Sequence, residues 1–331
     1  MAVAKVRAFL NVRPLMGALD ISSPLVFAPL FMERIWGGRR LETLYGKSLP
    51  ADRSIGESWE IVDRPEAQSV IISGPLQGHT LHHLWTTRRA EIFGKVPDAP
   101  RFPLFVKLLD ARETLSLQVH PPAEIAAELG GEPKTEFWYI ADATAEAEII
   151  LGLTKPTTRD QFAEAVRAGQ AAELVHRFPS RTGEGILLPS GRLHAVGGGN
   201  LIVEVQQNSD TTYRVFDWNR LDDSGTPRKL HIEESLRSIT FDDVRPTSQP
   251  ADGESLVRHE LFEIEKWQLT AAREVAPRGR FAIIGCLSGE VACAGVCAKA
   301  GEFFLVPASL ADRVLCPQAE RTSLLRIGIP A

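Results

Sequence analysis

A polar stripe within an otherwise apolar segment is the first feature of this sequence that could carry out chemistry. Ser116, Gln118 and His120 alternate with leucine and valine residues. Because side chains alternate between the two faces of a β-strand, these three polar side chains would share one face. An unpaired polar stripe on a buried strand is costly in free energy. The spacing therefore predicts an amide and an imidazole that point into one cavity.

Two further segments add candidate ligands. By the same alternation, Lys134 and Glu136 point the same way, so that an ammonium group lies beside a carboxylate. A Pro-x-Gly-x-x-His pattern ends at His194, and its tight turn could bring a second imidazole to the same cavity. Two imidazoles, one carboxylate and one amide form a plausible ligand set for zinc, manganese or iron.

Each of these residues also has an ordinary structural explanation. A single histidine on a strand is more often hydrogen bonded than metal bound, and a buried glutamine usually satisfies backbone groups. A glutamate is usually solvated. The presence of all of them in one polar set is what favours a metal site.

Composition limits the class of protein. The chain has 331 residues, 44% apolar and 24% charged, values typical of soluble globular proteins with room for two domains. Its net charge of −5 argues against a general nucleic-acid or membrane-surface binder. No segment approaches the ~20 apolar residues of a membrane helix, and the N-terminus lacks the apolar core and cleavage site of a signal peptide. We therefore expect a cytoplasmic protein.

The four cysteines lie in the last fifth of the chain. Cys293 and Cys297 form a C-x3-C pair, but no histidine follows residue 260 to complete a metal site. Cys286 and Cys316 have no partner at metal-site spacing. We therefore expect reduced, mostly buried thiols.

Short β segments separated by Gly, Pro and Asp dominate the chain from Leu25 onward, which predicts a mainly β protein. Residues 156–180 interrupt this pattern, with a capping box at Thr158 and Gln161 and helical spacing up to Phe178. Gly169 would divide this insertion into two short helices. A polar, Pro-containing linker spans residues 245–253. We thus expect an extension over residues 1–24, a large β domain over 25–245 and a smaller one over 246–331.

Seven blocks, in order, resemble the type I mannose-6-phosphate isomerases, which belong to the cupin superfamily. The blocks are Pro29-Leu-Phe-Met-Glu-Arg-Ile-Trp-Gly-Gly38, Ile55-Gly-Glu-Ser-Trp-Glu60, Phe102-Pro-Leu-Phe-Val-Lys-Leu-Leu-Asp-Ala111, Leu115-Ser-Leu-Gln-Val-His-Pro121, Lys134-Thr-Glu-Phe-Trp-Tyr139, Pro189-Ser-Gly-Arg-Leu-His-Ala195 and Glu204-Val-Gln-Gln-Asn-Ser-Asp-Thr-Thr-Tyr-Arg214. The short helical insertion resembles the compact bacterial form of the family. The resemblance implies two jelly-roll-like cupin β-barrels, of which the second is degenerate and lacks a ligand set.

The resemblance also implies a ligand set and an activity. One zinc ion would be bound by Gln118, His120, Glu136 and His194. Ser116, Lys134 and Arg214 would bind the substrate, a small phosphorylated sugar, and Glu204 would lie in the same cavity. The implied reaction interconverts mannose 6-phosphate and fructose 6-phosphate through a cis-enediolate.

The residues suggest roles in that reaction. Zinc and Arg214 would stabilise the enediolate, and Lys134 would bind substrate charge or handle a proton. Glu204 is the candidate base, because a desolvated carboxylate has a raised pKa. Lys134 is a rival base, and Glu204 could instead serve only to orient Arg214 through an ion pair.

Other functions stay open at this point. The chain could isomerise another aldose phosphate, or bind a sugar phosphate without catalysis. His120, Glu136 and His194 could also form the iron site of an oxygenase, although Gln118, Lys134 and Arg214 favour a phosphosugar site. No nucleic-acid or membrane partner is expected, and the protein could be a monomer or a homodimer.

Overall fold

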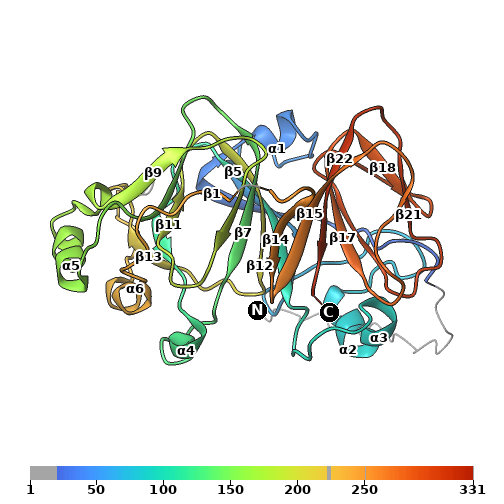
Figure 1. Cartoon of the computed structure of the whole chain (residues 1–331), viewed down its shortest axis with the longest axis horizontal. Helices are drawn as coiled ribbons and strands as arrows, with labels where there is room; N and C mark the ends of the chain where they lie inside the picture. Colours follow the sequence, from blue (N-terminus) through green and yellow to red (C-terminus); the bar gives the residue numbers. More distant parts are fainter. Residues whose placement is uncertain (1–20, 222–224, 250, 331) are drawn as a thin grey trace, which may run out of the picture.

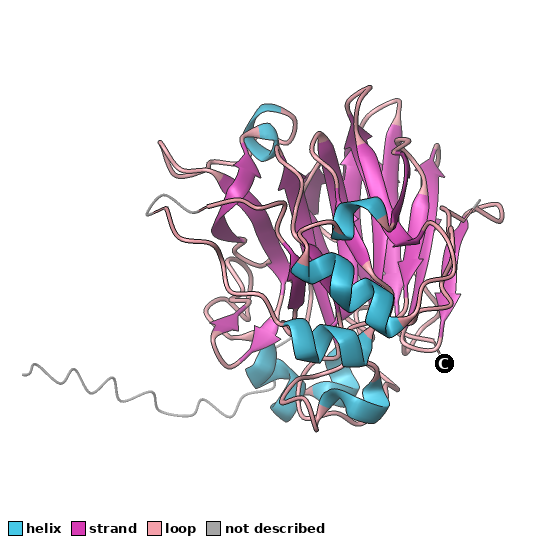
Figure 2. Cartoon of the chain, turned by 90° about the vertical axis from the view of Figure 1, so that its left-hand side faces the viewer, coloured by secondary structure: helices cyan, strands magenta, loops and turns pink. Residues whose placement is uncertain are grey.

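The computed structural model describes residues 21–221, 225–249 and 251–330. Most of the expected N-terminal extension, residues 1–20, lies outside the described residues. The described chain is mainly β, as predicted, and its strands form two stacked units (Figure 1). Figure 2 shows the short helices at the periphery of these strand layers.

The first unit contains two large antiparallel sheets. The six-stranded sheet has the order β1 (Leu30–Gly38), β2 (Ile55–Ile61), β5 (Leu104–Ala111), β12 (Asn200–Gln207), β7 (Glu136–Ala143) and β10 (Gly185–Leu188). The five-stranded sheet has the order β13 (Tyr213–Phe216), β6 (Leu117–Val119), β11 (His194–Val196), β8 (Glu148–Leu153) and β9 (Val175–Pro179). A small hairpin pairs β3 (Asp63–Arg64) with β4 (Ala67–Gln68).

An apolar core lies between these two sheets. Trp138 and Ile202 of the six-stranded sheet pack in one buried cluster with Ile149 and Val196 of the five-stranded sheet. Burial of large apolar side chains is the main favourable term in folding. This core therefore fixes the distance between the two sheets, and so the width of any cavity between them.

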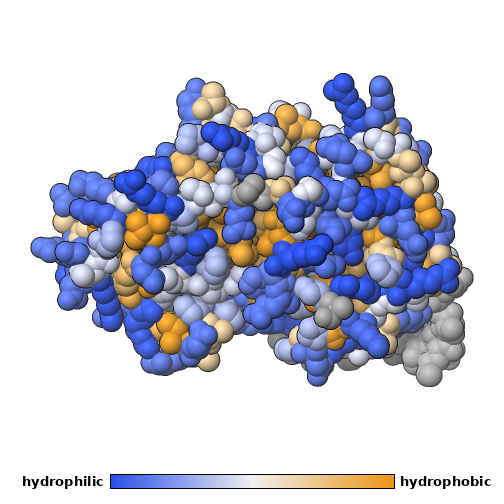
Figure 3. Space-filling model, in the orientation of Figure 1, coloured by the Kyte–Doolittle hydropathy of each residue, from blue (hydrophilic) through white to orange (hydrophobic). Residues whose placement is uncertain are grey.

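Short helices connect the strands. They are α1 (Arg40–Thr43), α2 (Leu81–Thr87), α3 (Arg89–Ile92), α4 (Ala123–Ala126), α5 (Arg159–Arg167), the 3-10 turn η1 (Ala171–Glu173) and α6 (Ile232–Ser238). Among the described residues, no helix is both long and apolar enough to cross a membrane. On the face shown in Figure 3, hydrophilic residues predominate and the apolar ones form separate small patches.

The helical insertion is shorter than its sequence pattern predicts. The predicted capping box is present, with Thr158 and Gln161 hydrogen bonded to each other's backbone. Gly169 has a φ of +71° and ends the helical segment of α5. As predicted, Gly169 divides the insertion, and the 3-10 turn η1 follows it. The helical expectation is wrong from Val175 onward, because Val175–Pro179 forms strand β9, in which Phe178 pairs with Ile149 of β8. Pairing with an existing strand outweighs the local helical spacing.

The last part of the chain forms a second pair of antiparallel sheets. One has the order β14 (Ser255–His259), β15 (Phe262–Leu269), β22 (Thr322–Gly328), β17 (Ala282–Ser288) and β20 (Phe303–Val306). The other has the order β16 (Arg273–Glu274), β21 (Val314–Pro317), β18 (Glu290–Cys293) and β19 (Val296–Lys299).

A second apolar core joins the two units. Val106 and Val203 of the six-stranded sheet pack in one cluster with Ile283 and Ile327 of the C-terminal sheet. Leu25, near the start of the described chain, forms an isolated β-bridge with Leu305 of β20. The six-stranded sheet is therefore covered on both faces, by its partner sheet on one side and by the C-terminal unit on the other.

Close contact between β1 and β2 leaves no room for a side chain at Gly37. A Cβ atom there would lie 2.4 Å from the backbone nitrogen of Gly56. We predict that Gly37→Ala lowers the free energy of unfolding by about 2 kcal/mol, because backbone must move to accommodate the methyl group. Urea denaturation measures this loss.

Gly328→Ala is the matched control. Its Cβ would meet only flexible side chains, those of Glu263 at 3.2 Å and Arg326 at 3.8 Å, so the loss should be much smaller. Equal losses in the two variants would contradict the steric explanation.

Candidate active site

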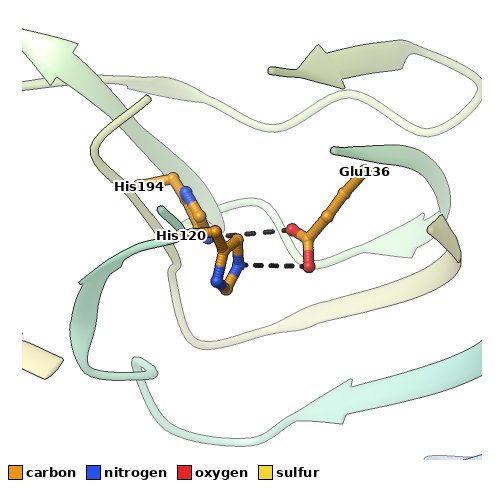
Figure 4. A group of neighbouring side chains, drawn as sticks. All are labelled: His120, Glu136 and His194. Carbon is orange, nitrogen blue, oxygen red and sulfur yellow. Dashed lines mark ion pairs between the residues drawn. The ribbon is translucent and has the colours of Figure 1, made fainter. Parts of the chain in front are cut away.

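Three ligand-bearing side chains from different strands converge in the first unit. Glu136 is the first residue of β7, His194 is the first residue of β11, and His120 directly follows β6. One ligand atom from each lies within 4.8 Å of the others (Figure 4). His120, Glu136 and His194 therefore form a candidate metal site, which we call the metal triad.

Strand register brings the triad and its neighbours together. On the five-stranded sheet, Gln118 of β6 is directly opposite His194 of β11 on one side and Arg214 of β13 on the other. Cross-strand partners in an antiparallel sheet share one face. Since Ser116 and Gln118 line the adjacent cavity, the predicted polar face of this segment is directed into the interior.

Backbone hydrogen bonds orient both imidazoles of the metal triad. His120 Nδ1 lies 2.7 Å from the carbonyl oxygen of Thr211, and His194 Nδ1 lies 2.8 Å from that of Arg192. A carbonyl can only accept, so these contacts assign the proton to Nδ1 in each ring. The Nε2 lone pairs are left to face Glu136, which is the orientation that a metal ligand requires.

Burial sets the protonation of the triad. The three residues are at most 2% exposed. Burial, and then the nearby Lys134, lower the pKa of His120. Burial and His120 lower the pKa of His194 to about 3. Burial alone would raise the pKa of Glu136, but Lys134 and His120 hold it well below its usual value. At neutral pH the site thus offers two neutral imidazoles and one carboxylate, the forms that bind metal.

The distances within the triad suit a small divalent ion. His120 Nε2 lies 3.2 Å from Glu136 Oε1, and His194 Nε2 lies 3.7 Å from Oε2. Ligand atoms about 2.1 Å from a tetrahedral ion are separated by about 3.4 Å. Oε2 of Glu136 is buried without a hydrogen-bond donor among the described residues, whereas Oε1 lies 2.6 Å from the ammonium group of Lys134, which borders the triad. The residues present therefore fit a metal.

A cavity of about 350 Å³ opens beside the metal triad. Its cationic lining residues are Arg34, Lys107, Lys134, Arg214 and Arg228, and its acidic ones are Glu57, Glu204 and Asp210. The cations outnumber the carboxylates, although the whole chain has a net charge of −5. This volume and charge suit a small anionic ligand.

Comparison with known proteins identifies the family. Residues 25–165 match the family model described as "Phosphomannose isomerase type I, catalytic domain". The probable mannose-6-phosphate isomerase GmuF of Bacillus subtilis is 37% identical over 307 residues, which is 88% of this chain and 96% of that protein. The mannose-6-phosphate isomerase ManA of the same organism is 38% identical, over 81% of this chain and 87% of its own. The chain belongs to the type I mannose-6-phosphate isomerase family.

Solved structures of this family share the fold. The crystal structure of the mannose 6-phosphate isomerase from Bacillus subtilis matches with a TM-score of 0.80 and 34% identity, over 93% of this chain and 100% of that chain. A mannose 6-phosphate isomerase bound with zinc and yttrium matches with a TM-score of 0.72 at 17% identity, over 93% of this chain. At that identity the likeness concerns the fold alone.

Glu204 has different neighbours from those that the sequence suggested. Its Oε2 lies 3.2 Å from Lys107 Nζ, and its Oε1 accepts a hydrogen bond of 2.9 Å from the indole of Trp138. Its ion-pair partner is therefore Lys107, which contradicts the alternative in which Glu204 only orients Arg214. Burial and the charge of Glu136 raise the pKa of Glu204, against the opposing effect of Lys107.

Several cavity residues were missed by the sequence reasoning. Lys107 was overlooked because it lies in an apolar block, yet a charged residue inside a buried strand is itself a signal. It is directly opposite Glu204 in the register of β5 and β12. Glu57 accepts hydrogen bonds from Arg34 and from the indole of Trp59, at 2.8 and 2.6 Å. Opposite charges thus alternate along the cavity wall.

The polar residues that follow Glu204 have structural contacts. Gln206 is buried and donates to the carbonyl oxygen of Ser209, at 2.6 Å. Asn208 donates to the carbonyl oxygens of Asp63 and Phe102. Strand parity alone therefore overestimated the polar face of β12, because only Glu204 of this set lines the cavity.

Arg214 lies at the side of the cavity where positive charge is concentrated. Its Nη1 donates to the carbonyl oxygen of Lys229, whereas its Nε is buried without a hydrogen-bond partner among the described residues. Burial and the neighbouring Arg228 lower the pKa of Arg214 from its usual value. Asp217 holds Arg228 through two hydrogen bonds, at 2.6 and 2.7 Å. Two guanidinium groups are thereby fixed at the cavity.

Metal content tests the triad directly. We predict that the purified protein contains about one divalent ion per chain, and that Glu136→Gln reduces this at least tenfold, because the triad loses its only anionic ligand. Elemental analysis by mass spectrometry measures the ion.

Glu204→Gln is the matched control for metal content. It removes a buried carboxylate from the same cavity without changing a triad residue, so it should retain the metal. Full metal content in Glu136→Gln would contradict the assignment.

Proposed function

We propose that this chain interconverts mannose 6-phosphate and fructose 6-phosphate with one zinc ion bound by Gln118, His120, Glu136 and His194. The observation that carries the proposal is the buried metal triad, oriented by backbone carbonyls, at a cavity rich in cations. Membership in the family supports the reaction. Gln118 is included because its side chain lies 3.3 Å from His194 Nε2, and its amide could present the oxygen to an ion.

Zinc suits the ligand set that these residues present. Nitrogen ligands from histidine and an oxygen from glutamate are typical of zinc, and they leave a position open for substrate. Bound there, zinc would act as a Lewis acid on the sugar oxygens without redox side reactions.

The cations of the cavity account for recognition of a phosphosugar. Arg228 supplies the geometry that binds phosphate best, a planar guanidinium with several donors. The Nε of Arg214 is buried without a hydrogen-bond partner among the described residues, and this donor would serve the enediolate oxygens. Ser116 lines the same cavity and adds a hydroxyl group. We infer that the phosphate binds on this side and directs C1 and C2 of the open-chain sugar towards the triad.

The reaction requires a proton to move between C1 and C2 through a cis-enediolate. Glu204 is the base that we propose, because burial raises the pKa of its carboxyl group and Lys107 and Trp138 fix its orientation. Arg214 would stabilise negative charge on the enediolate oxygens. Burial alone would lower the pKa of Lys134, but Glu136 and Glu204 raise it, which favours a role as a fixed positive charge.

We also propose that the chain comprises two cupin domains, residues 25–245 and 246–331. The strands of the second pair of sheets all lie after residue 254. Within the described part of the chain, the one group of three or more histidine, cysteine or acidic side chains suited to a metal belongs to the first domain. The second domain would then have a structural role, in a cytoplasmic enzyme.

Turnover with and without metal tests the proposed function. Purified protein should convert mannose 6-phosphate to fructose 6-phosphate, lose this activity with a chelator and regain it with added zinc. A coupled assay for fructose 6-phosphate measures the rate. No turnover by folded, zinc-loaded protein would overturn the substrate, and other aldose phosphates would then be assayed.

Exchange of the substrate C2 proton with solvent tests Glu204 as the base. We predict that Glu204→Gln slows exchange by a factor of about 10² or more, because general base catalysis contributes on this scale. Proton NMR in deuterated water follows the loss of the C2 signal. Glu57→Gln, which removes another carboxylate from the cavity, should slow exchange far less. Near-normal exchange in Glu204→Gln would exclude it as the base.

A further inference from the structure

A second cavity, of about 380 Å³, lies where the two units meet. It is separated from the active-site cavity by strands β1 and β2. Arg34 of β1 and Glu57 of β2 line the active-site cavity, whereas Phe31 of β1 and Glu60 of β2 line the second one. Because side chains alternate along a strand, the two cavities lie on opposite faces of the same two strands.

The loop after α1 forms one wall of this second cavity. It carries Tyr45, Lys47 and Ser48, and it approaches the C-terminal unit so closely that a Cβ at Gly301 would lie 2.4 Å from the Tyr45 ring. Figure 1 shows α1 beside the strands of that unit. The cavity is thus built from both units.

The polar part of the cavity wall is a buried ion pair. Lys47 Nζ lies 2.8 Å from Glu60 Oε1, with side chains 8% and 5% exposed. Ser58 donates a hydrogen bond of 2.5 Å to the same oxygen. A buried ion pair gives up hydration and often adds little stability over apolar residues of the same size. The position of this pair in a cavity wall therefore suggests recognition of a ligand.

The remaining wall is mainly apolar. Phe27 and Phe31 from the first unit pack in one apolar cluster with Phe303 from β20. Glu302 adds a second carboxylate at the exposed rim. Cavities that combine apolar rings with a few fixed polar groups are typical of small-molecule sites.

The chemistry of this wall selects a class of ligand. A phosphate would face two carboxylates, Glu60 and Glu302, against one cation. An ammonium group at the floor would meet the ammonium of Lys47. A hydroxyl group can accept from Lys47 and donate to Glu60 at once, and the apolar face of a sugar ring can pack on phenylalanine.

We propose that the second cavity binds a neutral, hydroxylated ring of the size of a free hexose. The second cavity thus differs in charge from the active-site cavity, where cations outnumber carboxylates. The two cavities would thus separate unphosphorylated from phosphorylated sugars. The proposal does not depend on the activity assigned to the first cavity.

A native thiol at the rim reports on occupancy. Cys297 lines the cavity and is exposed, whereas the half-buried Cys316 is not among the lining residues. Cys286 and Cys293 are buried, and burial raises the pKa of each thiol to about 12, which makes them unreactive. A bound ligand should therefore shield Cys297 from an alkylating reagent and leave Cys316 unaffected.

The experiment measures alkylation of both thiols by iodoacetamide in the full chain, through peptide mass spectrometry. We expect D-glucose to slow alkylation of Cys297 several-fold and saturably, and glucose 6-phosphate at the same concentration to have much less effect. Glu60→Gln should weaken the protection by glucose. Ser48→Trp, a change at the exposed rim, should occlude the cavity and remove the dependence on glucose.

The proposal is overturned by any of three results. The first is that glucose does not slow the alkylation of Cys297. The second is that glucose slows the alkylation of Cys297 and Cys316 equally. The third is that glucose 6-phosphate protects Cys297 more strongly than glucose does. Neither variant changes a residue of the metal triad or its cavity, so turnover of mannose 6-phosphate reports that each is folded. Should the protein lack that turnover, thermal unfolding serves as the folding control and the thiol measurement stands unchanged.

Discussion

The buried carboxylate of Glu136 is the constraint on which the rest of the first unit depends. A charge with almost no solvent contact is tolerated only when opposite charge or metal compensates for its lost hydration. Here two imidazoles and one ammonium group approach it, from β11, from the residue after β6 and from the segment before β7. The positions of β6, β7 and β11 are therefore tied together by electrostatics as well as by packing. The apolar core between the two sheets holds this arrangement at a fixed width.

Buried carboxylates outside the triad are also paired with cations. Glu204 is balanced by Lys107, and Glu57 by Arg34, so that charges of opposite sign follow one another across β12, β5, β2 and β1. Indole groups of Trp138 and Trp59 satisfy the remaining carboxylate oxygens. Pre-oriented charges of this kind stabilise a developing charge without having to reorganise. The polar wall of the cavity is thus a continuous feature of the six-stranded sheet.

Sequence reasoning succeeded where the information is local. Alternation placed Ser116 and Gln118 on a common face, and the Thr158 capping box marked the start of α5. It failed where the pairing of strands distant in the sequence determines the structure. Lys107 becomes part of the cavity only because β5 pairs with β12, and residues 175–179 become a strand only because β8 is adjacent. Arg228 is held in place by Asp217, eleven residues earlier in the sequence, and no periodic pattern in the sequence predicts this contact.

The shared core between the units has a consequence for synthesis on the ribosome. The outer face of the six-stranded sheet packs on strands β15, β17, β20 and β22, which emerge after it. The β-bridge between Leu25 and Leu305 likewise cannot form until Leu305 has been synthesised. During translation the catalytic sheet therefore presents an uncovered apolar face until these later strands have emerged and folded. Such faces recruit chaperones and promote aggregation, so a shortened gene that encodes only the catalytic half should yield insoluble protein.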